Sequence, residues 1–195
     1  MNLPNKLTLG RILLVPFFVA ALLIPFPSHN MFALLLFIAA SVTDLLDGRI
    51  ARKYNLITDF GKFADPLADK ILVLSALLCF IQLGWCDCVA VIIVLFREFA
   101  VTSIRLIAAA KGEVIAANQW GKIKTVTQMI AVITILTSRA AFDMIAPLLS
   151  AYSVNATILH WLFWSGELLI WISTFFAILS GVVYLSQNRR FISEK

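Results

Sequence analysis

Six apolar runs, each long enough to cross a lipid bilayer as a helix, follow one another along this chain of 195 residues. A bilayer core about 30 Å thick needs roughly 20 helical residues to cross it. Because backbone groups find no water inside a bilayer, helices are the expected structure of such runs. The sequence therefore predicts an all-α, polytopic membrane protein with six transmembrane helices, which cover approximately 7–27, 31–53, 61–85, 88–110, 118–138 and 161–186.

The composition agrees with this class of protein. Hydrophobic residues make up 61% of the chain and charged residues 14%, whereas soluble domains average about 45–50% and roughly 25%. No hydrophilic segment is long enough to fold separately, so we expect a single integral-membrane domain over 1–195. The half-apolar stretch 139–160 is predicted to be an extended connector that lies along the membrane surface.

The basic residues predict the orientation in the membrane. Fourteen of the 16 lysines and arginines fall on one side of the predicted spans, the exceptions being Arg97 and Arg139. Positively charged connections between spans face the cytoplasm. With an even number of spans, we therefore expect both termini and the connections after the second and fourth spans to be cytoplasmic.

Four aspartates gather at the cytoplasmic ends of two neighbouring predicted spans. Asp44 and Asp47 stand three residues apart near the end of the second span, and Asp65 and Asp69 stand four apart near the start of the third. Each spacing puts two carboxylates on one helix face. Four carboxylates in a place of low dielectric need compensating charge, which two divalent cations would supply. Oxygen ligands favour a hard cation, so the pattern predicts a site for Mg²⁺ or Mn²⁺.

Ordinary structural roles are the alternative for single members of this group. Asp65 precedes Pro66, as a helix-capping residue often does, and Asp47 could pair with Arg11 or Arg52. Four ionisable residues in paired helical spacing within membrane segments nevertheless favour a functional site.

The residues between the two aspartate pairs suit a phosphate ligand. Gly48, Ala51 and Gly61 leave room for a ligand close to the backbone, or else for close packing of helices. The planar guanidinium of Arg52 can bind two phosphate oxygens at once. Carboxylates, metal ions and an arginine together are typical of phosphoryl-transfer sites.

A second polar group lies in the fourth and fifth predicted spans. Arg97 and Glu98 are expected to pair with each other or with a polar group of a neighbouring helix, and Arg105 follows eight residues later on the same face. Lys122 and Lys124 begin the fifth span. Snorkelling of basic side chains to the interface is the alternative, above all for Lys122. Positive charge beside a metal site otherwise indicates an anionic second substrate.

The segment 44–69, "DLLDGRIARKYNLITDFGKFADPLAD", contains the pattern D-x2-D-G-x2-A-R-x8-G-x3-D-x3-D. It is similar, at every fixed position, to the signature of the CDP-alcohol phosphatidyltransferases. The resemblance implies a reaction in which an alcohol displaces CMP from a CDP-linked lipid, and it implies that family members tend to be homodimers. Carried over by position, it makes Asp69 the general base, Arg52 a diphosphate ligand, the small residues the cytidine pocket, and four carboxylates the ligands of two metals, namely Asp44, Asp47, Asp65 and Asp69.

Three shorter segments suggest the acceptor alcohol. The sequences "PNKLTLGR", "RE" and "GKIKTVTQ" resemble the phosphatidylglycerophosphate synthases of bacteria. This resemblance implies CDP-diacylglycerol and sn-glycerol 3-phosphate as substrates, with the acceptor phosphate near Arg105, Lys122 and Lys124. It also implies a multi-pass protein of the bacterial plasma membrane, and no nucleic-acid partner is expected.

Other functions remain open at this point. Within the same family the acceptor could be inositol phosphate, serine or, as in a cardiolipin synthase, phosphatidylglycerol. A divalent-cation transporter is a less favoured class, because transporters place ionisable groups near the bilayer midplane and often show an inverted repeat. Here the aspartates cluster at one face, and the sequence shows no repeat. A purely structural membrane scaffold would leave the four aspartates without a role.

Overall fold

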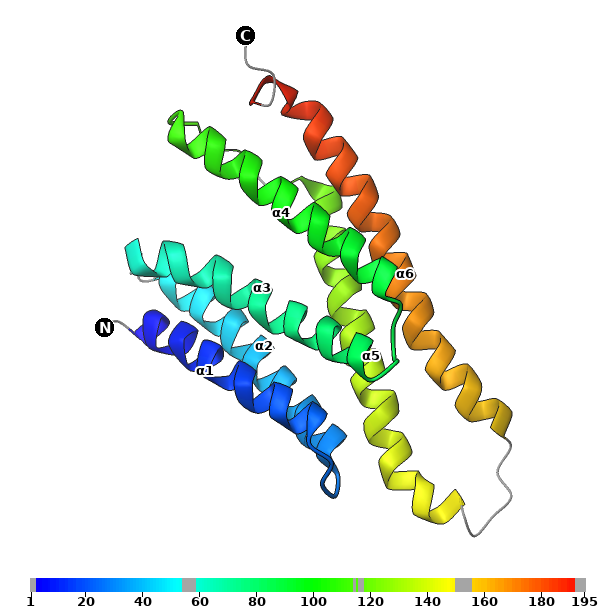
Figure 1. The fold of residues 1–195 in the computed structure, drawn as a ribbon. Coiled ribbons are helices and arrows are strands. Elements are labelled where there is room, and N and C mark those ends of the chain that lie inside the picture. The colour runs from blue at the N-terminus through cyan, green and yellow to red at the C-terminus, as the bar shows by residue number, and fades with distance from the viewer. Residues whose placement is uncertain (1–2, 54–58, 114, 116–117, 150–155, 192–195) are drawn as a thin grey trace.

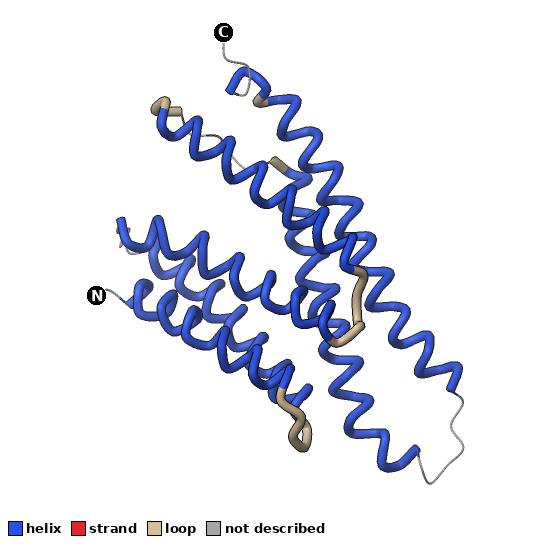
Figure 2. Tube along the Cα trace, in the orientation of Figure 1, coloured by secondary structure: helices blue, strands red, loops and turns tan. Residues whose placement is uncertain are grey.

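The computed structural model describes residues 3–53, 59–113, 115, 118–149 and 156–191. Over these residues the chain forms α-helices, one short 3₁₀ helix and no strand, which confirms the all-α prediction (Figure 2). The elements, labelled in Figure 1, are α1 (Leu3–Leu23), α2 (His29–Lys53), α3 (Asp59–Gln82), α4 (Cys88–Ala110), α5 (Gln119–Leu149), α6 (Ala156–Gln187) and η1 (Arg189–Phe191).

Each predicted span corresponds to one of these six helices, but the last two helices are longer than predicted. Helix α5 continues to Leu149 and α6 already begins at Ala156. The prediction of an extended connector over 139–160 is therefore wrong for 139–149 and 156–160, which are helical.

Arg139 explains why α5 does not end where the sequence predicted. Its guanidinium carbon lies 4.6 Å from the ring centroid of Trp85 and 3.7 Å from that of Phe163. Aromatic faces stabilise a cation in this position, and Asp143 follows one helical turn later. The charge is thus accommodated by tertiary contacts, and the helix passes through it.

Three helices carry stretches that are long and apolar enough to cross a membrane, counted over the described residues. They are Asn5–Leu23 in α1, Gln119–Ile145 in α5 and Phe163–Gln187 in α6. Shorter apolar stretches lie in α2 and α3, at His29–Asp44 and Lys70–Gln82. Helix α4 carries Arg97, Glu98 and Arg105 within its length. The chain is a multi-pass membrane protein, and α4 holds these three charged residues within an otherwise largely apolar helix.

The helices form two groups that meet along α2 and α5. Helix α1 packs against α2 and α3, while α6 packs against α4 and α5 (Figure 1). Buried aromatic and aliphatic side chains fill the core, and the rings of Phe18 and Phe37 lie 5.7 Å apart between α1 and α2. Large apolar residues such as Phe96 and Leu106 remain exposed, as expected for side chains that face lipid.

The two ends of the helix bundle carry different connections. The start of α1 and the end of α6 lie at the same end of the molecule, together with the end of α2 and the start of α3 (Figure 1). The α1–α2 turn and the α3–α4 loop lie at the opposite end. This arrangement agrees with an even number of spans, while the cytoplasmic side remains a prediction.

The α3–α4 loop contains a thiol whose reactivity the structure predicts. Burial raises the pKa of Cys86 to about 12, with a smaller contribution from the nearby carboxylates of Glu167 and Asp87. Since only the thiolate reacts, about 10⁻⁴ of this thiol is reactive at pH 8. We expect maleimide labelling of Cys86 to be slow and to rise about tenfold for each pH unit between 7 and 10.

The measurement uses a variant whose only cysteine is Cys86. A second variant, which retains only the exposed Cys88, is the matched control and should be labelled faster at pH 8. A labelling rate at Cys86 that levelled off below pH 9 would contradict the burial of this thiol.

Candidate active site

The four aspartates of the signature lie on helices, as the sequence predicts. Asp44 and Asp47 belong to α2, and Asp65 and Asp69 belong to α3. The end of α2 and the start of α3 lie at the same end of the bundle (Figure 1). Among the four, the side chain of Asp44 is described, and the side chains of the other three lie outside the described residues.

Helix α1 brings a buried polar face to this end of the molecule. Asn5, Thr8 and Arg11 follow one another at intervals of three, so they share one side of the helix, and all three are buried. The Nη1 atom of Arg11 lies 2.7 Å from Oδ1 of Asp44. Arg11 therefore pairs with Asp44. The pairing of Asp47 with Arg11 or Arg52 stays a prediction, because the side chain of Asp47 lies outside the described residues.

The roles predicted for the remaining residues of the signature stay predictions. Gly48, Ala51 and Arg52 lie on the last turns of α2, and Gly61 lies on the first turn of α3. Their side-chain surroundings lie outside the described residues.

A cavity of about 430 Å³ opens between α3, α4, α5 and α6. Among the described residues that line it are four basic side chains and one carboxylate, a formal net charge of +3. An anion is the ligand that such a cavity would attract. The lining residues are Lys70, Val73, Leu74, Arg97, Glu98, Val101, Thr102, Arg105, Asn118, Gly121, Lys124, Thr125, Gln128, Met129 and Tyr184.

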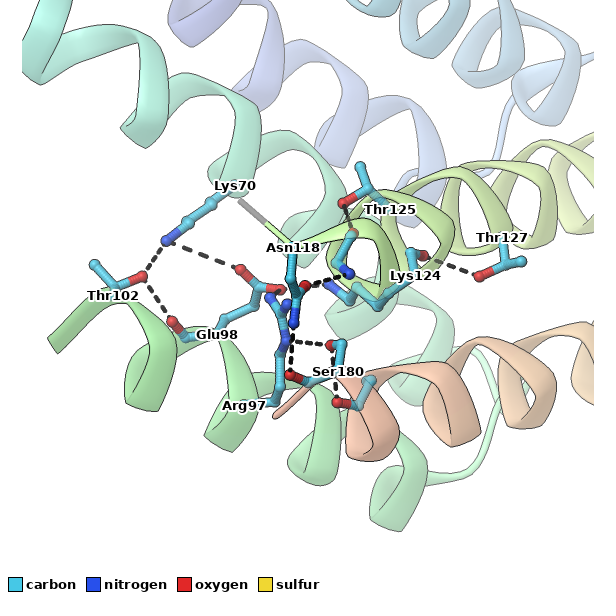
Figure 3. A network of polar contacts seen from close by, with 11 residues as sticks. Lys70, Arg97, Glu98, Thr102, Asn118, Lys124, Thr125, Thr127 and Ser180 are labelled. Carbon is cyan, nitrogen blue, oxygen red and sulfur yellow. Dashed lines mark hydrogen bonds and ion pairs between the residues drawn. The ribbon is translucent and has the colours of Figure 1, made fainter. Parts of the chain in front are cut away.

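Glu98 is at the centre of the polar contacts in this cavity (Figure 3). Its Oε1 atom accepts hydrogen bonds from Nζ of Lys124 at 2.5 Å and from Nη1 of Arg97 at 3.0 Å. Its Oε2 atom lies 3.8 Å from Nζ of Lys70, which also donates to the hydroxyl of Thr102. One carboxylate on α4 thus contacts cations from α3, α4 and α5.

Arg97 connects the same network to α6. Its Nε atom donates to the hydroxyl of Ser180 at 2.9 Å, and Asn118 donates to the backbone oxygen of Ser180 at 3.5 Å. Asn118 also caps α5, because its side-chain oxygen accepts a hydrogen bond from the backbone of Gly121. The predicted pairing of Arg97 with Glu98 or with a neighbouring helix is confirmed in both forms.

Burial makes these pairings necessary. The side chains of Lys124, Arg97 and Glu98 are 5%, 11% and 15% exposed. An unpaired buried charge is costly, and breaking such a pair leaves the remaining partner uncompensated. The four helices around the cavity are therefore held in register by charge as well as by apolar packing.

The predicted acceptor residues fall into two groups. Arg105 and Lys124 line the cavity. Lys122 is exposed and does not line it; this residue borders a shallow hollow on the surface of α5. Lys70 lines the cavity although the sequence analysis did not select it. Its position directly after Asp69 was the signal that could have identified it.

Two further lining residues are polar, neutral and buried. Gln128 is 3% exposed and Tyr184 is 2% exposed. The Nε2 atom of Gln128 and the hydroxyl of Tyr184 have no hydrogen-bond partner among the described residues. Buried polar groups are usually paired, so these two are candidates to bond a ligand in the cavity. Tyr184 lies on α6, far from every motif in the sequence.

Comparison with known proteins gives the family. The model of the CDP-alcohol phosphatidyltransferase family matches residues 1–179. The CDP-diacylglycerol–glycerol-3-phosphate 3-phosphatidyltransferase of Bacillus subtilis is 42% identical, over 96% of this chain and 95% of that protein. The protein of the same name from Rickettsia bellii is 34% identical over 97% of both chains. A relative from Arabidopsis thaliana, CDP-diacylglycerol–glycerol-3-phosphate 3-phosphatidyltransferase 2, is 35% identical over the whole chain and 83% of its own length. The chain belongs to the CDP-alcohol phosphatidyltransferase family.

Proposed function

We propose that this protein transfers the phosphatidyl group of CDP-diacylglycerol to sn-glycerol 3-phosphate, forming phosphatidylglycerophosphate and releasing CMP. Family membership supports the class of reaction, and the names of the relatives from Bacillus subtilis and Rickettsia bellii support the acceptor. The cationic cavity is the single structural observation that favours a phosphorylated acceptor over a neutral one.

The donor half of the site is assigned to the signature on α2 and α3. The carboxylates of Asp44, Asp47, Asp65 and Asp69 would hold two divalent cations, and their oxygen-only chemistry fits Mg²⁺ or Mn²⁺. The pairing of Asp44 with a buried arginine shows that this end of the bundle already compensates carboxylate charge. When bound, such cations offset the negative charge of the diphosphate and of departing CMP.

The rest of the signature would bind the donor nucleotide. Gly48, Ala51 and Gly61 would leave space for the cytidine close to the helix backbones, and Arg52 would bind diphosphate oxygens through its planar guanidinium. These positions lie on the facing ends of two neighbouring helices, so one nucleotide could contact both.

The acceptor half of the site is assigned to the cavity. The phosphate of sn-glycerol 3-phosphate is a dianion, which suits a lining with a formal charge of +3 over the described residues. Arg105 and Lys124 are the proposed phosphate ligands, while Lys122 stays a sequence-based prediction on the exposed surface of α5. Gln128 and Tyr184 would bond the hydroxyl groups of the glycerol, because their buried polar atoms have no other described partner.

Asp69 is proposed as the general base, and its place on α3 supports this role. It stands between Ala68, which is fully buried, and Lys70, which lines the cavity. The acceptor hydroxyl oxygen bonds to the phosphorus that carries diacylglycerol, and the bond from that phosphorus to the oxygen of CMP breaks. The hydroxyl proton passes to the carboxylate of Asp69, which acts as a base within hydrogen-bond reach.

The proposal also includes a cellular location and an oligomeric state. We expect the protein in the plasma membrane of a bacterium, with the site facing the cytoplasm, where water-soluble glycerol 3-phosphate is available and CMP can be released. We also expect a homodimer, which the molecular mass of the protein in detergent would reveal.

The function is tested by adding labelled glycerol 3-phosphate, CDP-diacylglycerol and Mg²⁺ to purified protein. The expected result is labelled phosphatidylglycerophosphate and one CMP for each lipid formed. Transfer to serine, inositol phosphate or phosphatidylglycerol instead would keep the family and change the acceptor. Uptake of divalent metal into proteoliposomes without any transfer would favour the transporter.

A further inference from the structure

We propose that Glu98 is a positioning residue that holds Lys70 and Lys124 in place for the phosphate of the acceptor, with Arg97 fixing Glu98 in turn. This inference rests on the proposed function, because it assigns the acceptor phosphate to the cavity. It goes beyond that function by giving a role to a carboxylate in a site that binds an anion.

The negative charge of Glu98 is unfavourable for binding an anion in the cavity. The cavity is suited to an anion, and a carboxylate at its wall lowers the positive potential that would attract one. Glu98 therefore does not improve anion binding through its charge. A carboxylate in this place has to contribute through the cationic side chains that it keeps in position.

Glu98 contacts two lysine side chains that come from different helices. Oε1 binds the ammonium of Lys124 from α5, at 2.5 Å, and Oε2 lies 3.8 Å from the ammonium of Lys70 from α3 (Figure 3). Lysine side chains are long and have many rotamers, so an unheld ammonium loses entropy when a ligand orders it. Contact with one carboxylate orders both ammonium groups beforehand and offsets their mutual repulsion. Each retains further N–H donors for a ligand.

Arg97 occupies a space that two glycines leave open. A Cβ atom at Gly121 would lie 3.1 Å from Nη2 of Arg97, and a Cβ atom at Gly181 would lie 3.2 Å from its Cγ. These glycines belong to α5 and α6, so the arginine is enclosed where three helices meet. With Ser180 bound to its Nε and Glu98 to its Nη1, Arg97 sets the direction of the carboxylate.

Glu98→Gln is the decisive substitution, because it keeps the shape of the side chain and removes its charge. The positioning role predicts that the KM for glycerol 3-phosphate rises about tenfold or more, the loss typical of a charge-assisted hydrogen bond. The KM for CDP-diacylglycerol should stay within about twofold, since the donor site lies elsewhere. Glu98→Asp should recover part of the acceptor affinity. An account based on charge alone predicts the opposite sign, a lower KM for glycerol 3-phosphate.

Two matched controls separate this effect from general damage. Glu167→Gln removes a carboxylate from α6 outside the network, and it should leave both KM values unchanged. Gly166→Ala would bring a Cβ atom to 2.5 Å from Cγ1 of Ile135. It disturbs the packing of α5 on α6 without touching Glu98, so it should lower thermal stability without raising the KM for glycerol 3-phosphate selectively.

A milder substitution keeps the inference testable if Glu98→Gln does not fold. Thr102→Val removes the hydroxyl that accepts from Lys70 and donates to the backbone oxygen of Glu98. It should raise the same KM by roughly threefold, about the net contribution of one hydrogen bond, because Lys70 keeps its ion pair with Glu98.

The outcomes distinguish the two proposals. A folded Glu98→Gln variant with an unchanged or lower KM for glycerol 3-phosphate overturns the positioning role, and so does an unchanged KM in Thr102→Val when that variant has to decide. Wild-type protein without transfer to glycerol 3-phosphate overturns the proposed acceptor and this inference with it.

Discussion

Asp69→Asn is expected to lower the turnover number by about 10²–10⁴-fold, the usual contribution of a general base. Asparagine has nearly the same shape as aspartate but cannot take the proton of the acceptor hydroxyl. The neighbours of Asp69 on α3 are the buried Ala68 and the cavity residue Lys70, so the change is made at the junction of the donor and acceptor halves. The measurement is the rate of CMP release with both substrates saturating.

Asp87→Asn is the matched control for this substitution. Asp87 caps α4 by accepting a hydrogen bond from the backbone of Val89 at 2.6 Å, and asparagine caps helices about as well. The control should therefore keep both its fold and its turnover. If Asp69→Asn retained wild-type turnover while remaining folded, the assignment of the base would be wrong.

Removal of divalent metal is expected to reduce transfer to below about 1% of the full rate. The metals are proposed to stabilise the negative charge of the transition state by several kcal/mol. In the proposed site, these metal ions are the only divalent cations that the four carboxylates of α2 and α3 bind. The experiment treats the purified protein with excess EDTA, removes the chelator and measures transfer before and after addition of Mg²⁺ or Mn²⁺. Readdition should restore the rate.

The ion pair between Arg11 and Asp44 gives this experiment a second reading. With the metals removed, Asp44 still has a cationic partner 2.7 Å away, so the bundle should stay folded by circular dichroism. Loss of activity without loss of helix content is the expected result. Full transfer activity in protein shown by elemental analysis to be free of metal would contradict the two-metal site.

Much of the fold follows from the order of apolar runs along the chain. Each run became one helix, because in a membrane the backbone can satisfy its hydrogen bonds only within such elements. The boundary at Arg139 was mispredicted for a physical reason. A charged residue within an apolar run indicates the end of a span in one dimension, but Trp85 from the α3–α4 loop and Phe163 from α6 stack on this arginine.

In the site, too, contacts between residues that are close in sequence could be predicted, and contacts between distant residues could not. The aspartate pairs were predicted because spacings of three and four residues define one face of a helix. The pairing of Arg97 with Glu98 was also local. The hydrogen bond from Arg97 to Ser180 joins residues 83 positions apart, and no spacing rule connects Tyr184 to the cavity. These contacts depend on how α6 packs against α4 and α5.

The most direct test of the proposed function is an acceptor competition with the purified protein, CDP-diacylglycerol and Mg²⁺. Glycerol 3-phosphate, serine, inositol phosphate and phosphatidylglycerol are supplied together at equal concentration, each with a distinct label, and the lipid products and CMP are counted. The account predicts that label from glycerol 3-phosphate dominates the lipid fraction and matches the CMP released. Preferential labelling from another acceptor, or no CMP release with glycerol 3-phosphate, would contradict it.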